Sequence, residues 1–321
     1  RLLPETALGE VATGLVFFAI FAGIGDLGTT KTVVRHVSAN TDLLWPIVRT
    51  ALWRRVLGGL ASGVVVVVGL AVAGAAVRPI VVALAAVAAA ASGCTEIAFA
   101  ALRTLAHSRT EQAVLILERI GFIAIAVGLI QLGGGSVSIL VLYVVTNVIS
   151  GTVTTVAVLR RRSPIKTAHS VPSLWDAEAR RTALGFALFT VTPRIGPAVL
   201  ALLVAPAVVA EFSVAYRPAE GIALFALAAG VPLLPILRTH VLAGRQQAIE
   251  QGTAAVVRVL GAALTPFVVV FIGWPELIIW TLTGSEVYGS ANQTLAILGL
   301  IVFTWNFRGI GESLLYAQER A

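Results

Sequence analysis

The chain has 321 residues, of which 58% are hydrophobic and only 12% are charged, with a mean hydropathy of +0.93 and a formal net charge of +7. A soluble domain is about half apolar and about one quarter charged, so this composition excludes an ordinary soluble protein and favours one that is solvated by lipid. The single cysteine, Cys94, excludes an intramolecular disulfide and is typical of a small core residue.

Long apolar runs follow one another along the chain, separated by charges, prolines and glycines. A helix needs about 20 apolar residues to cross the hydrocarbon, so these runs predict membrane-spanning helices. The predicted spans are residues 8–30, 54–77, 79–102, 111–133, 136–159, 181–204, 208–236, 249–273 and 291–317. Membrane β-strands alternate apolar and polar residues, and the run over residues 63–77 does not. The predicted fold class is therefore all-α, a polytopic transmembrane helix bundle.

Basic residues between the spans predict which side of the membrane each loop faces, because lysine and arginine near helix ends are retained in the cytoplasm. Most of the 23 basic residues fall into loops on one side, whereas the other side holds only Arg1 and Arg78. This asymmetry predicts that Arg1 lies outside and Ala321 lies in the cytoplasm. It also accounts for the net charge through topology, without a nucleic-acid-binding face.

The longest polar connection, residues 161–180, contains serines and prolines and is predicted to be a cytoplasmic linker. It divides the chain into an N-terminal membrane lobe, residues 1–160, and a C-terminal membrane lobe, residues 181–321. The chain has no methionine and begins at Arg1, which predicts that it is a fragment of a longer protein.

Short matches between the lobes predict an internal repeat, which is common in secondary transporters. Residues 8–11 (LGEV) open a span that ends near residues 35–37 (RHV), and residues 209–212 (VAEF) open one that ends near residues 238–241 (RTHV). Glu96 followed by Arg103 is matched by Glu312 followed by Arg320.

Residues 23–28 (GIGDLG) have the spacing of a dinucleotide-binding loop but lack the strand and the helix around it that such a site needs. Inside an apolar span, these glycines favour close helix packing instead.

Arginines within the spans are the strongest candidates for function, because a charge at mid-bilayer costs a few kcal/mol or more and usually marks a cavity. Arg194 lies about 20 Å along its helix from Arg181, too deep to reach the inner surface easily. Pro193, Gly196 and Pro197 around it predict a broken helix. The predicted cavity residues that bind substrate are Arg119, Arg194, Arg217, Arg258 and Arg308.

Alternative interpretations stay open for three of these arginines. Arg217 and Glu220 share one helical face, so they either neutralise each other or contribute to the cavity. Arg258 and Arg308 either line the same cavity or extend to the membrane surface.

A few carboxylates within or near the spans are candidates for coupling transport to an ion: Asp26, Glu96, Glu118, Glu220 and Glu312. Glu118 and Arg119 are sequence neighbours and cannot face each other, so at least one needs a partner on another helix or a wet cavity. The excess of arginine predicts an anionic ligand, and the guanidinium fork suits a pyrophosphate. No arrangement of nucleophile and base and no metal-ligand spacing is present, so we predict no enzymatic activity, catalytic residue, metal or cofactor beyond H+ or Na+ coupling.

These features resemble the polysaccharide (O-antigen type) flippases of the multidrug/oligosaccharidyl-lipid/polysaccharide exporter superfamily. Residues 3–9 are similar to the family's outer loop after its first helix, and residues 26–35 continue the resemblance. Residues 211–217 (EFSVAYR) through Pro235 are similar to its eighth helix, and residues 283–288 (TGSEVY) to its outer loop ahead of helix ten. The resemblance implies two pseudo-repeated lobes around a central cavity, with this chain covering helices two to ten of twelve or fourteen.

The resemblance also implies a function. The chain is expected to move a polyprenyl-pyrophosphate-linked oligosaccharide from the inner to the outer leaflet of a bacterial inner membrane by alternating access, for cell-surface polysaccharide assembly. A proton or sodium gradient is the expected drive, and the expected partners are the lipid-linked oligosaccharide, membrane lipid and the polysaccharide polymerase or assembly proteins of the cell envelope, but no nucleic acid.

Other functions of the same architecture stay open. An ion-coupled multidrug or small-molecule exporter would prefer acidic and aromatic cavity groups, which the arginine excess disfavours. A peptidoglycan-precursor lipid flippase belongs to the same superfamily, and a non-transporting assembly subunit of the cell envelope would need no cavity charges.

Overall fold

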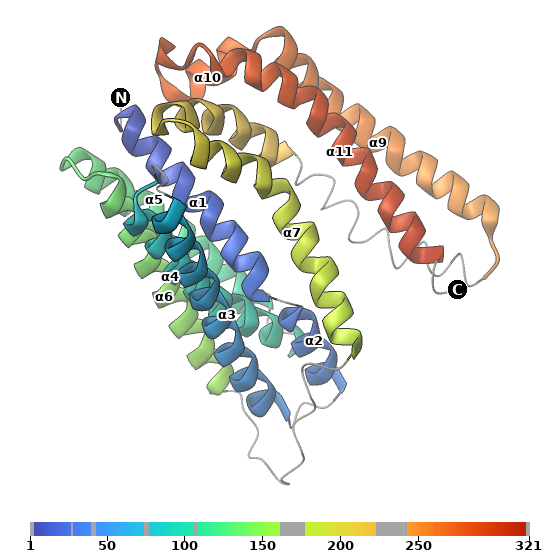
Figure 1. The fold of residues 1–321 in the computed structure, drawn as a ribbon. Coiled ribbons are helices and arrows are strands. Elements are labelled where there is room, and N and C mark those ends of the chain that lie inside the picture. The colour runs from blue at the N-terminus through green and yellow to red at the C-terminus, as the bar shows by residue number, and fades with distance from the viewer. Residues whose placement is uncertain are drawn as a thin grey trace. The chain divides into compact units, whose positions relative to one another are not determined.

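The structure is a computed structural model that describes residues 3–26, 28–39, 43–73, 77–105, 108–160, 177–222, 240 and 243–318. Within these residues the fold is all-helical and contains no strand (Figure 1). Of the described helices, six are long and apolar enough to cross a membrane, so the chain is a multi-pass membrane protein. The predicted fold class is confirmed.

The chain forms two compact units, residues 2–209 (the N-terminal unit) and residues 210–321 (the C-terminal unit). The helices of the N-terminal unit are α1 (Glu5–Asp26), α2 (Thr29–Ala39), α3 (Leu44–Ala73), α4 (Pro79–Thr104), α5 (Ser108–Gln131), α6 (Ser136–Leu159) and α7 (Ala177–Leu203). A helix over residues 206–222 crosses the boundary between the units. The C-terminal unit contains α9 (Gln246–Gly273), α10 (Pro275–Thr283), the short 3-10 helix η2 (Glu286–Tyr288) and α11 (Ala291–Gln318).

Two predicted helix boundaries are wrong. The first span ends at Asp26 rather than at residue 30, because Gly28 adopts a φ of 71°, a left-handed conformation that ends one helix and lets α2 begin. α3 begins at Leu44, well before the predicted residue 54, because Leu44, Ile47 and Ala51 are fully or almost fully buried in a core shared with α2 and α4.

Small residues let α1, α3 and α4 approach one another closely. A Cβ atom at Gly25 would lie 3.3 Å from the Gly59 nitrogen, and one at Gly59 would lie 3.2 Å from Ala90 Cα. A Cβ at Gly63 would overlap that of Ala86. This is the packing that the sequence predicts for the glycines of residues 23–28.

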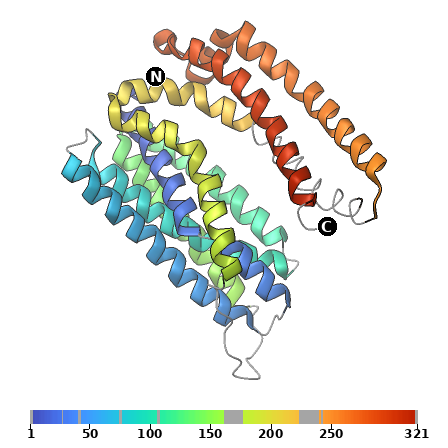
Figure 2. The ribbon, with the colours of Figure 1, turned by 45° about the vertical axis from the view of Figure 1, so that its right-hand side comes forward.

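α7 packs with the N-terminal unit, although it follows the predicted linker. A Cβ at Gly23 of α1 would lie 2.8 Å from Thr190 Cγ2 of α7, and one at Gly9 would overlap the Pro206 carbonyl after α7. Both views show α7 beside α1 (Figures 1 and 2). The boundary between the two compact units therefore falls after Val209 and not at the predicted linker. Most of that linker, residues 161–176, lies outside the described residues.

The predicted break in this helix is wrong, because α7 continues as one helix through Pro193 and Pro197. A proline inside a membrane helix removes a backbone hydrogen bond, and packing against neighbouring helices makes this tolerable. Here Ala201 of α7 packs in a buried cluster with Ala12 of α1 and Val209.

We predict that Gly63→Ala lowers the free energy of unfolding by about 1–3 kcal/mol, because the added Cβ overpacks the contact between α3 and α4. Thermal unfolding of the purified protein in detergent measures the effect. Gly121→Ala in α5 is the matched control, since nothing lies within 4 Å of a Cβ at that position. Equal unfolding temperatures for the two variants would contradict the close α3–α4 contact.

Candidate functional site

A buried arginine joins three helices of the N-terminal unit. Arg55 Nη1 of α3 lies 2.9 Å from Asp26 Oδ1 at the end of α1, and Arg55 Nη2 donates a hydrogen bond to Glu96 Oε2 of α4. The Arg55 and Asp26 side chains are 2% and 4% exposed, whereas the Glu96 side chain is 47% exposed. We call these three residues the Arg55 cluster. It combines one positive and two potentially negative groups among apolar helices.

Asp26 is fixed in this cluster because it also caps α2. Its Oδ1 accepts hydrogen bonds from Thr29 Oγ1 at 3.1 Å, from the Thr30 nitrogen at 3.2 Å and from Thr30 Oγ1 at 2.6 Å. A carboxylate at a helix start also interacts favourably with the helix dipole. Asp26 therefore connects α1, α2 and α3 through one carboxyl group.

The stem of Arg55 passes through a gap in α4 that Gly93 creates. A Cβ atom at Gly93 would overlap Arg55 Cγ and would lie 2.8 Å from its Cδ. Arg55 Nε is buried and has no hydrogen-bond partner among the described residues. Arg55 Nη1 also makes no hydrogen bond by geometry and is held by the ion pair with Asp26. An enclosed arginine with unsatisfied donors is tolerable only with charged partners, so Asp26 and Glu96 are essential to its position.

Sequence analysis predicted Asp26 and Glu96 as ion-coupling candidates but missed Arg55. Arg54 and Arg55 open the predicted span of residues 54–77 and were counted among the basic residues on the cytoplasmic side, because the long apolar run begins after them. The structure places both inside α3. The signal that could have found Arg55 is the apolar stretch of residues 43–48, which extends the helix before the two arginines.

A second polar group lies near the middle of α5 and α6. The Tyr143 side chain of α6 lies near the charged side chains of Glu118 and Arg119 in α5. Asn147 is 4% exposed, and its amide donates to the Tyr143 carbonyl oxygen at 2.7 Å. Arg119 is exposed and Glu118 is half-buried. We call Arg119, Tyr143 and Asn147 the mid-membrane cluster.

The depth of this cluster follows from helix geometry. Arg119 lies about 16 Å along α5 from its first residue, which is about half the 30 Å thickness of the hydrocarbon. The rings of Phe18 in α1 and Phe122 in α5 meet the Tyr143 ring edge-on, with centroids 5.1 Å and 5.6 Å away. An exposed arginine at this depth is typical of a wet cavity or a polar pathway.

The side chains of three further arginines among the predicted site residues are described. Arg194 is half-buried within α7. Arg217 pairs with Glu220 at 3.2 Å, which is one of the two interpretations that the sequence left open. Arg258 is exposed and donates to the carbonyl oxygen of Ala254 in its own helix at 3.2 Å. The side chains of the two remaining candidates, Arg308 and Glu312, lie outside the described residues.

Ion pairs also connect helix ends in the N-terminal unit. Glu10 near the start of α1 accepts hydrogen bonds from Arg78 Nη1 at 3.1 Å and from Ser136 Oγ at the start of α6. Arg103 at the end of α4 contacts Glu111 at the start of α5 through three hydrogen bonds of 2.6 to 2.9 Å. These contacts set helix register rather than a binding site.

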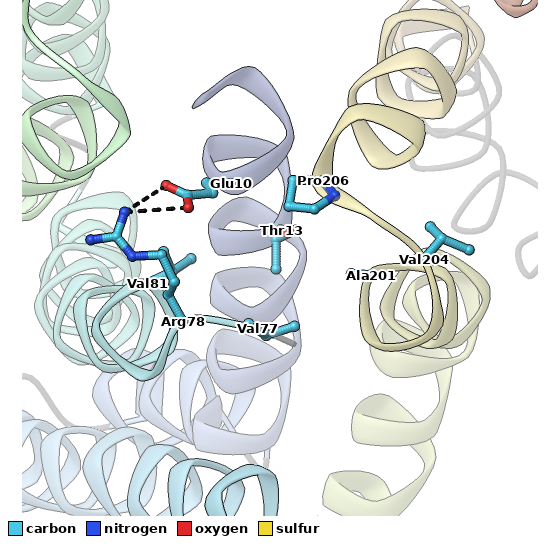
Figure 3. A pocket seen from close by; sticks show the side chains of 8 residues that line it. All are labelled: Glu10, Thr13, Val77, Arg78, Val81, Ala201, Val204 and Pro206. Atoms are coloured by element: carbon cyan, nitrogen blue, oxygen red, sulfur yellow. Dashed lines mark hydrogen bonds and ion pairs between the residues drawn. The ribbon is translucent and has the colours of Figure 1, made fainter. Parts of the chain in front are cut away.

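The pocket in Figure 3 adjoins the Glu10–Arg78 pair and has mainly aliphatic walls. It is lined by Glu10, Thr13, Val77, Arg78, Val81, Ala201, Val204 and Pro206. The Arg78 guanidinium turns toward Glu10, on the side of α1 away from Ala201 and Val204 (Figure 3). The pair therefore joins α1 to the residue before α4 and does not fill the pocket.

No protein-family model matches the chain, and no curated protein matches its sequence. Among solved structures, the chain is similar to the inward-facing conformation of a multidrug resistance MATE family transporter of the MOP superfamily. The TM-score is 0.65 at 15% sequence identity, and the match covers 99% of this chain and 84% of that chain. At this identity the similarity shows the fold, so the chain has the helical fold of that transporter.

We predict that Arg55→Gln lowers the free energy of unfolding by about 3–5 kcal/mol, because it leaves the buried Asp26 without its counter-charge. The double variant Arg55→Gln, Asp26→Asn is expected to recover part of this loss, because it removes the uncompensated carboxylate. Thermal unfolding in detergent measures both. Two results would overturn the buried pair. One is an Arg55→Gln variant as stable as the unaltered protein, and the other is a double variant whose loss equals the sum of the losses of Arg55→Gln and Asp26→Asn measured separately.

Proposed function

We propose that the chain is an alternating-access exporter of a bacterial inner membrane that moves a polyprenyl-pyrophosphate-linked oligosaccharide from the inner to the outer leaflet. Its product would serve cell-surface polysaccharide assembly. The mid-membrane cluster is the observation that carries this proposal, because it puts an exposed arginine beside a tyrosine and an amide at mid-bilayer depth. The transporter fold supports the alternating-access mechanism.

The chemistry of the mid-membrane cluster fits both polar parts of such a ligand. The planar fork of Arg119 can donate two hydrogen bonds to a phosphate group, and Tyr143 lies near it. Tyrosine hydroxyl and asparagine amide groups both donate and accept hydrogen bonds, as sugar hydroxyls require. Arg194 adds another positive charge among the helices of the same unit.

The polyprenyl tail of the proposed substrate needs no protein pocket, because it can stay in the lipid. α5 presents a broad apolar surface beside Arg119, with Ile116, Leu117 and Ile120 exposed by 56%, 70% and 61%. A lipid-linked substrate can therefore keep its tail in the hydrocarbon while its headgroup contacts the polar side of α5.

Multidrug export is the second candidate, because the similar solved structure is a multidrug resistance transporter. A cationic drug would be bound best by carboxylates and aromatic rings. Glu118 and the rings of Phe18 and Phe122 could serve that purpose, whereas Arg119 would oppose it. A peptidoglycan-precursor flippase would also bind a pyrophosphate, so substrate assays must separate these functions.

We further propose that Glu96 binds the coupling proton. With both carboxylates ionised, the Arg55 cluster carries one net negative charge among apolar helices, and protonation of Glu96 would neutralise it. The Oδ1 atom of Asp26 already receives the cap hydrogen bonds of α2, whereas the Glu96 side chain is 47% exposed and accessible to a proton. The charged groups that surround Glu96 are Asp26, Arg55 and Arg103.

We predict that Arg119→Ala slows flipping by roughly tenfold or more, because a charge-assisted hydrogen bond contributes about 1.5–3 kcal/mol. Arg119→Lys keeps the charge but loses the bidentate fork, so it is expected to retain an intermediate rate. The measurement is transfer of a fluorescent polyprenyl-pyrophosphate oligosaccharide between leaflets of proteoliposomes that hold the full-length protein.

Arg109→Ala is the matched control for this prediction, because Arg109 is exposed near the start of the same helix. It is expected to leave the rate unchanged. Efflux of small organic cations without transfer of any lipid-linked sugar would overturn the flippase and favour multidrug export. Transfer of only a polyprenyl-pyrophosphate disaccharide–peptide would favour the peptidoglycan-precursor function.

We predict that Glu96→Gln removes the response of transport to an imposed pH gradient while the protein stays folded, because glutamine cannot release a proton. Transport is compared with and without the gradient in proteoliposomes. Glu276→Gln, at an exposed position in α10, is the control and should keep the response. A full response in Glu96→Gln, or a response of the unaltered protein only to sodium, would overturn proton binding at Glu96.

A further inference from the structure

α10 is too short to cross a membrane, although it connects two helices of membrane length. It has 9 residues, whereas α9 and α11 have 28 residues each. At about 1.5 Å per residue, α10 extends about 14 Å, less than half of the roughly 30 Å hydrocarbon core. It must therefore lie near the membrane boundary, where α9 ends and α11 approaches its start.

One side of this helix presents large apolar residues that the protein does not cover. Leu277 and Trp280 are 56% and 59% exposed, and their spacing of three residues places them on one side of the helix. Trp274, the residue just before the helix, is 60% exposed. Ile279 on the other side is 3% exposed and anchors the helix within its unit.

The two threonine hydroxyls and the last turn of α10 are satisfied by its own backbone. The Thr281 and Thr283 hydroxyls donate to carbonyl oxygens four residues earlier, at 2.6 Å and 2.7 Å. Gly284 ends the helix with a φ of 60°, and its nitrogen donates to the Trp280 carbonyl oxygen at 2.7 Å. Glu276 in the first turn is the one charged residue of the helix. This pattern suits surroundings that contain little water.

We propose that the side of α10 formed by Trp274, Leu277 and Trp280 binds the interface region of the lipid bilayer, between the headgroups and the acyl chains. Tryptophan favours this region, because its ring is apolar and its N–H can donate to a polar lipid group. Leu277, between the two rings, would enter the upper acyl region. α10 contains no basic residue, so apolar partition drives this binding and anionic lipid is not required.

This lipid contact would fix the depth of the α9–α11 connection. Both neighbouring helices contact α10 within the C-terminal unit. Their ends would therefore keep a constant position relative to the lipid headgroups. The proposal does not depend on which substrate the protein carries.

A spin label tests this proposal, and the single cysteine makes it practical. In a Cys94→Ala background, a nitroxide is attached to Leu277→Cys in the full chain, reconstituted in vesicles of neutral phosphatidylcholine. Collision rates with oxygen, which enriches in hydrocarbon, and with a water-soluble nickel chelate report the depth. Leu117→Cys in α5, 70% exposed, provides the hydrocarbon reference, and Gln247→Cys, exposed at the start of α9, provides the water reference.

The label at Leu277→Cys is expected to give an oxygen rate well above that of Gln247→Cys and a nickel rate between the two references. A nickel rate equal to that of Gln247→Cys would place α10 in water, and one equal to that of Leu117→Cys would place it deep in hydrocarbon. Low rates with both reagents would mean that protein covers this side of α10. Each of these three results would overturn the proposal.

Discussion

A charge within an apolar helix bundle needs a nearby partner, and much of the N-terminal unit is organised by this constraint. Arg55 can reach Asp26 at 2.9 Å only because glycines let α1 and α3 approach closely, and it can reach Glu96 only because Gly93 leaves room for its stem. Asp26 in turn is oriented by the start of α2. The loss of any one of these features would leave a charge without compensation, so the sequence requirements of the cluster extend well beyond its three charged residues.

Hydropathy predicts most of the helices, because a helix in lipid satisfies its own backbone hydrogen bonds and its apolar length is nearly sufficient to define it. The same property explains what it misses. α2 is short and carries polar residues, and α10 is too short to count as a span, so hydropathy detects neither as a membrane-spanning helix. The start of α3 was missed because Arg54 and Arg55 interrupt its apolar run, and the compensation of Arg55 by Asp26 and Glu96 comes from helices distant in sequence.

Partners on helices distant in sequence also limit how well the sequence predicts the candidate sites. The sequence predicts that at least one of Glu118 and Arg119 needs a partner on another helix or a wet cavity, and the structure places Tyr143 of α6 near both. Tyr143 and Asn147 were not predicted, because neutral polar residues are common in membrane helices and only their neighbours reveal a cluster. Arg217 and Glu220 illustrate the opposite case, in which a spacing of three residues contains the whole interaction and sequence alone can suggest the pair.

At two positions that the predicted internal repeat matches, the structure shows contacts of a similar type. Glu10 opens α1 and accepts a hydrogen bond from Arg78, the residue before α4. Glu211, its match in the sequence repeat, accepts one from Ser290, the residue before α11. The sequence match of Glu96 with Glu312 independently relates α4 to α11. Each unit therefore uses an equivalent carboxylate to hold the start of one helix against the start of another.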